Sequence, residues 1–236
     1  MARGRVYGLA VLISCFCLVM EGCGSADHDA PLRVPHANSG NGAGSVPSSP
    51  ASAPEPNPPQ SASTTNYNSA VWAKVKNSKT WTDAVIAGVD SKIASFERAR
   101  DIEDFCPGYS KASKLSREVC WLRLVGGVVE FESSFNPTDS FKEPDGDMSV
   151  GLLALSPNEC ANAPTEAALK DPVKNLVCGI TIMARLIAAD GFIDGPTSAR
   201  GASKYWSTLR APYISGKYHL GKKDQIIPIT KLYSAY

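Results

Sequence analysis

The chain has 236 residues, of which 43% are hydrophobic and 20% are charged, and its formal net charge is +1. This composition is ordinary for a globular protein and suits one domain of catalytic size with additional segments. Basic and acidic residues are nearly balanced, without the excess of Lys and Arg typical of nucleic-acid-binding proteins, so we expect no nucleic-acid partner. His28, His36 and His219 fall outside any metal-ligand spacing and no CxxC occurs, so we expect no metal and no other cofactor.

The first 22 residues have the pattern of an export signal. Two arginines precede an apolar run over residues 7–20, which is too short for a convincing transmembrane helix. Small residues around Cys23, directly after this run, resemble a bacterial lipobox. We therefore predict a lipoprotein-type signal peptide over residues 1–22, lipidation of Cys23, and a lipoprotein of the outer membrane or facing the periplasm. Lipidation of Cys15 and plain secretion are the alternatives.

Residues 23–67 are predicted to be a tether. The segment consists mainly of Ser, Pro, Ala, Gly and Asn. Such a composition cannot bury enough apolar surface to offset the entropy lost on ordering. We expect the folded domain to occupy residues 68–236.

Four cysteines remain after removal of the signal peptide and lipidation of Cys23. They are Cys106, Cys120, Cys160 and Cys178. An even number of cysteines in an exported protein indicates disulfides. Of the three possible pairings, we predict the two that close short loops, Cys106–Cys120 and Cys160–Cys178.

The first helix of the folded part is predicted to begin at Thr80, because Thr80 and Asp83 have the spacing of a capping box. An apolar stripe at helical spacing follows. It consists of Trp81, Val85, Val89, Ile93 and Phe96. These side chains are expected to belong to the core.

A second helix is predicted from Ser116 to Ser133, and it places a carboxylate at the end of an apolar face. Glu132 shares this face with three valines at i, i+3, i+4 and i+7 spacing, namely Val125, Val128 and Val129. Pro137 prevents the helix from continuing, so Glu132 lies where a cleft can open. Desolvation raises the pKa of a carboxyl group, which a general acid near neutral pH requires. The alternative is a glutamate that frays into solvent.

Residues 138–149 are polar, and we interpret them as a loop or a short β-hairpin. Three of its carboxylates lie 11, 13 and 15 residues after Glu132. Two of these residues, Glu143 and Asp147, are our candidates for a second catalytic carboxylate. The alternative for each is a solvated side chain in an acidic loop. A short apolar segment follows over residues 149–155.

The remainder of the chain predicts further helices. Asp171 and Pro172 have the residue types of an N-cap and a first helical position, and Gly191 ends this helix. A short helix is predicted over residues 202–209, and an apolar tail is expected to pack back on the domain. The sequence therefore predicts an α+β fold that is mostly helical, with a small β-hairpin.

Three motifs resemble those of the soluble lytic transglycosylase and goose-type lysozyme superfamily. They are ESSFNP at residues 132–137, SVGLL at 149–153 and NLVCG at 175–179. The resemblance implies a lysozyme-like domain that cleaves the β-1,4 bond between MurNAc and GlcNAc in peptidoglycan, with Glu132 as general acid and base. It also implies five substrate-binding residues, which are Ser133, Ser149, Gly151, Leu152 and Tyr205. The expected partners are peptidoglycan glycan strands and, through the lipid anchor, a membrane.

The chain departs from the family pattern at two places. Ala154 stands where a glutamine closes the second motif, and a tyrosine-asparagine motif late in the domain is absent, so that Tyr205 is the candidate for the aromatic hydroxyl. Both departures leave open whether the enzyme is a lysozyme, which hydrolyses the bond, or a lytic transglycosylase, which forms a 1,6-anhydro product. The alternative function is a peptidoglycan-binding lipoprotein that has lost catalysis.

Overall fold

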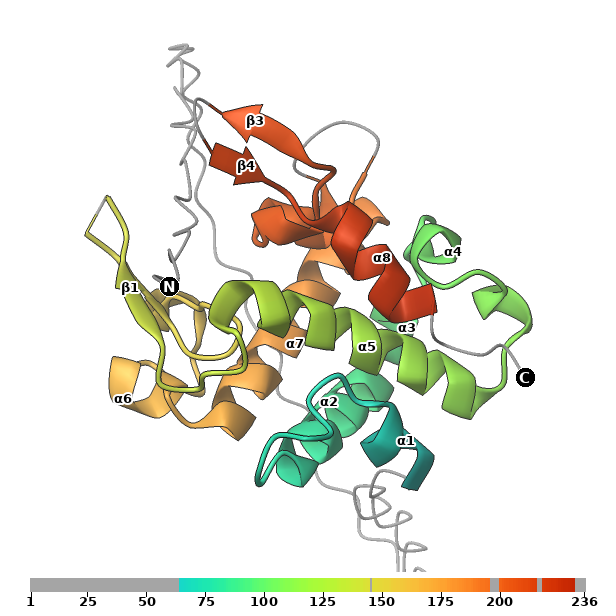
Figure 1. Ribbon diagram of the computed structural model, residues 1–236, viewed down its shortest axis with the longest axis horizontal. Coiled ribbons are helices and arrows are strands. Elements are labelled where there is room, and N and C mark those ends of the chain that lie inside the picture. Colours follow the sequence, from blue (N-terminus) through green and yellow to red (C-terminus); the bar gives the residue numbers. More distant parts are fainter. Residues whose placement is uncertain (1–63, 145, 196–199, 216–217, 232–236) are drawn as a thin grey trace, which may run out of the picture. The chain divides into compact units, whose positions relative to one another are not determined.

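The computed structural model describes residues 64–144, 146–195, 200–215 and 218–231 (Figure 1). The predicted signal peptide, Cys15, Cys23 and all but the last few residues of the predicted tether lie outside the described residues. The longer helices are α2 (Lys79–Ser91), α5 (Lys114–Ser133), α7 (Pro172–Asp190) and α8 (Lys223–Lys231). The shorter ones are α1 (Thr64–Ser69), α3 (Ile93–Phe96), α4 (Ile102–Phe105) and α6 (Glu166–Leu169).

The described strands form two antiparallel pairs. One pair joins β1 (Ser140–Lys142) and β2 (Met148–Val150), and the other joins β3 (Tyr213–Ser215) and β4 (Tyr218–Leu220). The prediction of a mostly helical fold with a small β-hairpin is therefore confirmed by β1 and β2. The second hairpin was not predicted.

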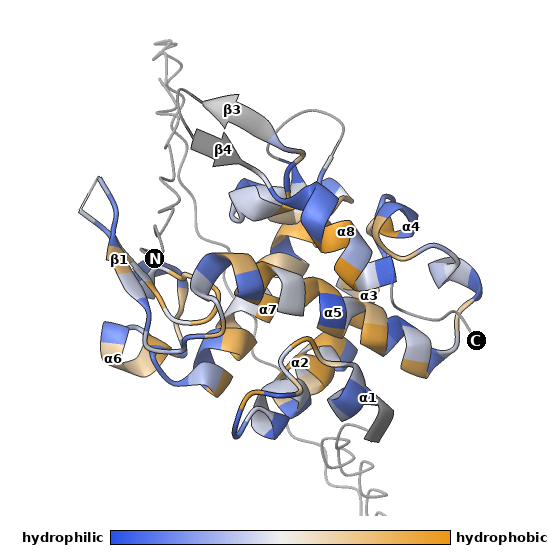
Figure 2. Cartoon of the chain, viewed as in Figure 1, coloured by the Kyte–Doolittle hydropathy of each residue, from blue (hydrophilic) through white to orange (hydrophobic). Residues whose placement is uncertain are grey.

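Helix α5 is the element on which the core is built. It contacts α1, α2 and α8, and the β1–β2 hairpin lies near its C-terminal end (Figure 1). Seven of its side chains are completely buried, namely Cys120, Trp121, Leu122, Leu124, Val125, Val128 and Val129. Apolar residues also predominate on the buried face of α7 (Figure 2), so this helix, although long and apolar enough to cross a membrane, packs as a core helix.

Two adjacent glycines in α5 allow close packing of its neighbours. A Cβ atom at Gly126 would lie 2.6 Å from Val71 Cγ2, and one at Gly127 would lie 3.2 Å from Ile226 Cγ2 on α8. Each glycine costs about 1 kcal/mol of helix propensity relative to alanine. The close approach of these neighbours accounts for glycine at both positions.

Both predicted disulfides are present. Cys106 pairs with Cys120, which ties the end of α4 to α5, and Cys160 pairs with Cys178 on α7. Disulfides persist in oxidising compartments. The two bonds therefore indicate an extracytoplasmic protein.

Two local predictions are wrong. Helix α2 begins at Lys79 without a side-chain cap, and the Asp83 carboxylate instead accepts a hydrogen bond from the Tyr67 hydroxyl at 2.7 Å. The helix predicted over residues 202–209 is divided into two 3₁₀ helices, η3 (Gly201–Lys204) and η4 (Ser207–Leu209). The division occurs at Trp206, whose extended backbone lets its indole N–H donate to the Leu153 carbonyl at 2.9 Å.

Candidate active site

The end of α5 is shaped by two residues with strained backbones. Ser134 and Phe135 have φ angles of 50° and 63°, in the left-handed region that costs a non-glycine residue about 1–2 kcal/mol. The Ser134 N–H donates to the Glu130 carbonyl at 3.1 Å and ends the helix. The chain then turns toward the β1–β2 hairpin, and Glu132 is left in the last turn of the helix.

Glu132 has the environment of a proton donor. Its side chain keeps partial solvent access, but its carboxyl group is desolvated, and this burial raises its pKa to about 7. The Thr208 hydroxyl donates to Oε1 at 2.8 Å and lowers the pKa, while the negative charge of Glu143 raises it. Glu132 therefore exchanges its proton near neutral pH, as general acid and base chemistry requires.

Glu143 lies at the first position of the turn between β1 and β2. The Ser149 hydroxyl donates to its Oε1 at 2.6 Å, and its Oε2 is buried without a hydrogen-bond partner among the described residues. Its charge acts on the pKa of Glu132. The structure thus brings together a second carboxylate and the carboxyl group of Glu132.

Asp147 lies at the other end of the same turn. Its side chain is exposed, and its backbone carbonyl accepts the N–H of Glu143 at 2.8 Å. The hairpin carboxylate whose charge acts on the pKa of Glu132 is Glu143. Of the two candidates for a second catalytic carboxylate, the geometry favours Glu143.

Ser133 connects the end of α5 to the segment that follows β2. It is buried, and its hydroxyl lies 2.9 Å from the Leu152 carbonyl and 3.1 Å from the Val129 carbonyl. Leu152 is also completely buried. In this structure both residues position the site from inside the fold, and a contact of either with substrate stays a prediction.

Asn175 explains the spacing of the second and third motifs. Its Nδ2 donates to the Val150 carbonyl at 2.9 Å, and its Oδ1 accepts the Leu153 N–H at 3.0 Å. Gly151, with a φ of 76°, fits against this amide because a Cβ atom there would lie 2.4 Å from Nδ2. A Cβ atom at Gly179 would likewise lie 2.2 Å from Leu153 Cδ1. These contacts fix the turn beside Glu132.

Tyr205 lies near both glutamates. Its hydroxyl oxygen accepts the Ser156 N–H at 2.9 Å. Burial raises the pKa of Tyr205 to about 12, although the hydrogen bond from Ser156 lowers it. The negative charges of Glu159, Glu132 and Glu143 add to the increase. The phenol therefore keeps its proton at physiological pH and can donate a hydrogen bond.

The contact of Thr208 with Glu132 was not predicted from the sequence. Its hydroxyl bonds to Glu132, and its carbonyl accepts the Lys222 N–H at 2.8 Å, just before α8 begins. Thr208 and Glu132 are 76 positions apart, and no motif includes Thr208. A pairing over this separation leaves no periodic signal in the sequence, so only the fold reveals it.

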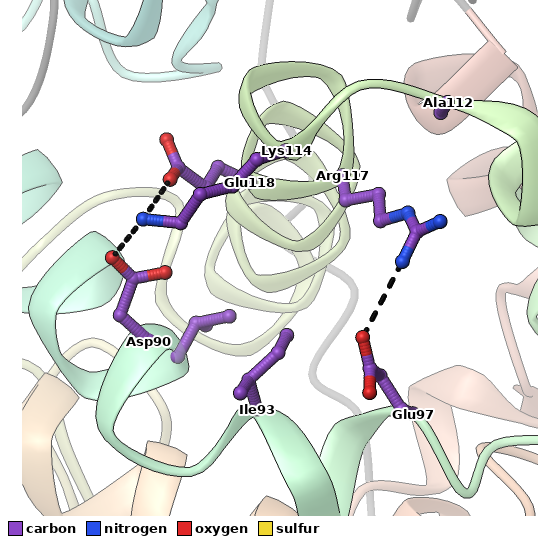
Figure 3. Close-up of a pocket in the computed structure, with 8 residues that line it drawn as sticks. Asp90, Ile93, Glu97, Ala112, Lys114, Arg117 and Glu118 are labelled. Atoms are coloured by element: carbon purple, nitrogen blue, oxygen red, sulfur yellow. Dashed lines mark hydrogen bonds and ion pairs between the residues drawn. The ribbon is translucent and has the colours of Figure 1, made fainter.

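A cavity of about 410 Å³ lies at the opposite, N-terminal end of α5 (Figure 3). Lys114, at this end, is about 27 Å along the helix from Glu132 at 1.5 Å per residue. The cavity is lined by Val89, Asp90, Ile93, Glu97, Ala112, Lys114, Arg117 and Glu118. Its charged groups form ion pairs with one another, so it offers no free acid or base. No cluster of three or more metal-ligating side chains occurs within the described part of the chain.

No protein-family model and no curated protein matches the chain. A solved structure does match: "Bd0314 DslA wild-type form 2" is 29% identical, with a TM-score of 0.60, over 70% of this chain and 96% of that one. The chain is structurally similar to DslA. Two further DslA structures, each of a variant with one glutamate changed to glutamine, match with TM-scores of 0.59 and 0.60 at the same identity and coverage.

Proposed function

We propose that this protein is an enzyme that cleaves the glycan strand of peptidoglycan at the β-1,4 bond between MurNAc and GlcNAc. The observation that carries the proposal is the desolvated Glu132 carboxyl, with a pKa of about 7, beside Glu143 at the end of an apolar helix. The ESSFNP motif at residues 132–137, which resembles that of lytic transglycosylases and goose-type lysozymes, supports the choice of substrate.

The DslA variants support an enzyme that uses two glutamates. Their substitutions lie at positions 143 and 154 of that protein's own numbering, 11 residues apart. Glu132 and Glu143 of this chain are also 11 residues apart. A glutamine keeps the shape of a glutamate but cannot transfer its proton, so variants of this type are suited to testing acid–base residues. The shared spacing supports Glu132 and Glu143 as the catalytic pair.

In the proposed mechanism, Glu132 in its protonated form donates a proton to the glycosidic oxygen as the bond to the anomeric carbon breaks. The carboxylate of Glu143 stabilises the positive charge that develops on the sugar ring. Glu132 then accepts a proton from the attacking group. If that group is water the reaction is hydrolysis, and if it is the 6-hydroxyl of the same sugar the product is a 1,6-anhydro ring.

Product analysis tests the proposal. The purified protein is incubated with acetylated and with chemically deacetylated sacculi, and the soluble products are analysed by mass spectrometry. Reducing ends are the expected result for a lysozyme, and anhydro-muramyl ends for a lytic transglycosylase. Glu132→Gln should release neither, whereas Glu130→Gln, on the same helix, should match the wild type. No release from either substrate by the wild type, or equal release by Glu132→Gln, would contradict the proposal.

The second candidate is a peptidoglycan-binding protein without catalysis, which Ala154 in place of the family's glutamine favours. Sedimentation with intact sacculi, in the absence of any released fragment, would support it.

We further propose that the protein is exported and anchored to a membrane through Cys23, with the segment over residues 23–67 as its tether. The two disulfides support export. Metabolic labelling with a radioactive fatty acid should mark the wild type, whereas Cys23→Ser should remove the label. Persistence of the label in that variant would favour Cys15.

A further inference from the structure

Phe141 lies on the face of the β1–β2 hairpin that carries Glu143. The strand register places Phe141 directly opposite Ser149, and residues opposite each other in an antiparallel pair project from the same face. The Ser149 hydroxyl bonds to the Glu143 carboxylate at 2.6 Å, so Glu143 projects from that face as well. An aromatic ring, a hydroxyl and the second carboxylate of the proposed site therefore share one surface.

The side chain of Phe141 is not buried in the hydrophobic core. Phe141 is 40% exposed, and among the described residues the other exposed large hydrophobic side chains are Leu115 and Val177. A single exposed apolar residue needs no explanation by itself. Phe141 is distinguished by its position. It is an exposed aromatic residue on the same face as Glu143, the carboxylate whose charge raises the pKa of Glu132.

We propose that Phe141 is a saccharide-stacking residue, whose ring packs against the C–H face of a pyranose of the glycan strand beside Glu143. A pyranose exposes its hydroxyl groups around the ring edge and C–H groups on its faces. The negative face of an aromatic ring attracts such C–H groups, and covering both surfaces removes apolar area from water. The inference rests on the proposed substrate, since it names the residue that recognises the sugar ring.

This contact would act on binding and not on the proton transfer. A phenyl ring donates no proton, and it covers the same sugar face before and during bond cleavage. An interaction that is equal in the ground and transition states changes KM and leaves kcat unaltered. Phe141→Ala should therefore raise KM by roughly 10- to 30-fold, as expected for the loss of a partly covered aromatic side chain, with kcat and the pH profile unchanged.

A binding measurement separates this inference from catalysis. In the Glu132→Gln background, sedimentation with glycan strands freed of their peptides gives an affinity without cleavage. Adding Phe141→Ala should weaken this affinity by roughly 10- to 30-fold, whereas Phe141→Tyr should preserve it. Leu115→Ala is the matched control, because Leu115 is an aliphatic residue of similar exposure at the far end of α5. Thermal unfolding checks that each variant is folded. We expect that all are, because Phe141 and Leu115 are exposed.

Three outcomes would overturn the inference: unchanged affinity in Phe141→Ala, an equal loss in Leu115→Ala, or a loss seen with intact sacculi but not with peptide-free strands. The last would assign the contact to the peptide. The two proposals can fail separately. A wild type that binds through Phe141 but releases no fragment would refute the enzyme and keep the sugar contact, and an active enzyme indifferent to Phe141→Ala would do the reverse.

Discussion

Carboxylates lie at both ends of α5, but their partners differ. At the N-terminal end, Lys114 Nζ lies 3.0 Å from Asp90 and 3.2 Å from Glu118, and Arg117 lies 3.3 Å from Glu97. Figure 3 shows these two sets of ion pairs on either side of Ile93. At the C-terminal end, within the described residues, no ion pair involves Glu132 or Glu143, and their donors are the neutral hydroxyls of Thr208 and Ser149.

The difference teaches that the partner of a carboxylate, and not its residue type, decides what it can do. A nearby cation favours the ionised form and keeps a carboxylate charged, whereas desolvation beside a second negative charge favours the protonated form. The first arrangement suits a stable surface, and the second suits the proton donor of the proposed active site. Active sites commonly reduce stability in this way.

The largest expected effect is the loss of cleavage in Glu132→Gln, by about 10³-fold at neutral pH, because general acid catalysis contributes about 10²–10⁴-fold. The rate of release from sacculi measures it. A cleavage rate within tenfold of the wild type would show that Glu132 at the C-terminal end of α5 is not the general acid.

The same substitution should stabilise the protein at alkaline pH. The pKa of Glu132 is raised from 4.5 to about 7 in the folded state, so the folded state binds more protons than the unfolded state between these values, and stability falls as pH rises through this range. Glutamine does not titrate. Relative to the wild type, Glu132→Gln should therefore gain up to about 3 kcal/mol in free energy of unfolding at pH 8, and nothing from this source at pH 4. Urea denaturation at both pH values checks the sign.

Substitution of the second carboxylate distinguishes Glu143 from Asp147. Glu143→Gln should reduce cleavage by about 10²-fold, the loss expected for one electrostatic contact with the transition state. It should also lower the pKa of Glu132, because a negative charge that raises it is removed. The alkaline limb of the pH–rate profile then moves to lower pH. Asp147→Asn is the matched control in the same turn, and a larger loss there than in Glu143→Gln would reverse the assignment.

Removal of the Thr208 hydroxyl should move the pH profile in the other direction. The hydrogen bond from Thr208 lowers the pKa of Glu132, so Thr208→Val should raise that pKa and extend activity to higher pH. We expect the rate at the optimum to fall by a few-fold, to about one third, from poorer orientation of the carboxyl group. Thr208→Ser keeps the donor and should retain the wild-type profile. A profile that does not move in Thr208→Val would show that the bond has no role in titration.

The smallest effect is expected at the paired end of the helix. Lys114→Met breaks both ion pairs of a side chain that is 66% exposed, and such surface pairs contribute about 0–1 kcal/mol each. Denaturation should show a loss of this order, and cleavage should be unchanged. A loss of cleavage would show that the two ends are coupled.

The parts of the protein that were predictable from its sequence are those determined locally. The apolar stripe that ends in Glu132 follows from helical periodicity, and the short loops between cysteines favoured the observed disulfides. The wrong predictions occurred where a distant partner intervened. Asp83 is engaged by Tyr67 instead of capping a helix, and the indole of Trp206 reaches Leu153 and divides a segment with helical spacing.

The bond between Thr208 and Glu132 also sets an order of assembly. A chain emerges with its N-terminal part first, so α5 can form well before its hydroxyl donor exists. A nascent chain that ends before residue 206 lacks both this donor and the indole that holds the Leu153 carbonyl. The environment of the Glu132 carboxyl group is therefore complete only when the segment around residues 206–208 has folded onto the end of α5 and the turn at Leu153. A product truncated before residue 206 carries Glu132 without the Thr208 hydroxyl that bonds to it.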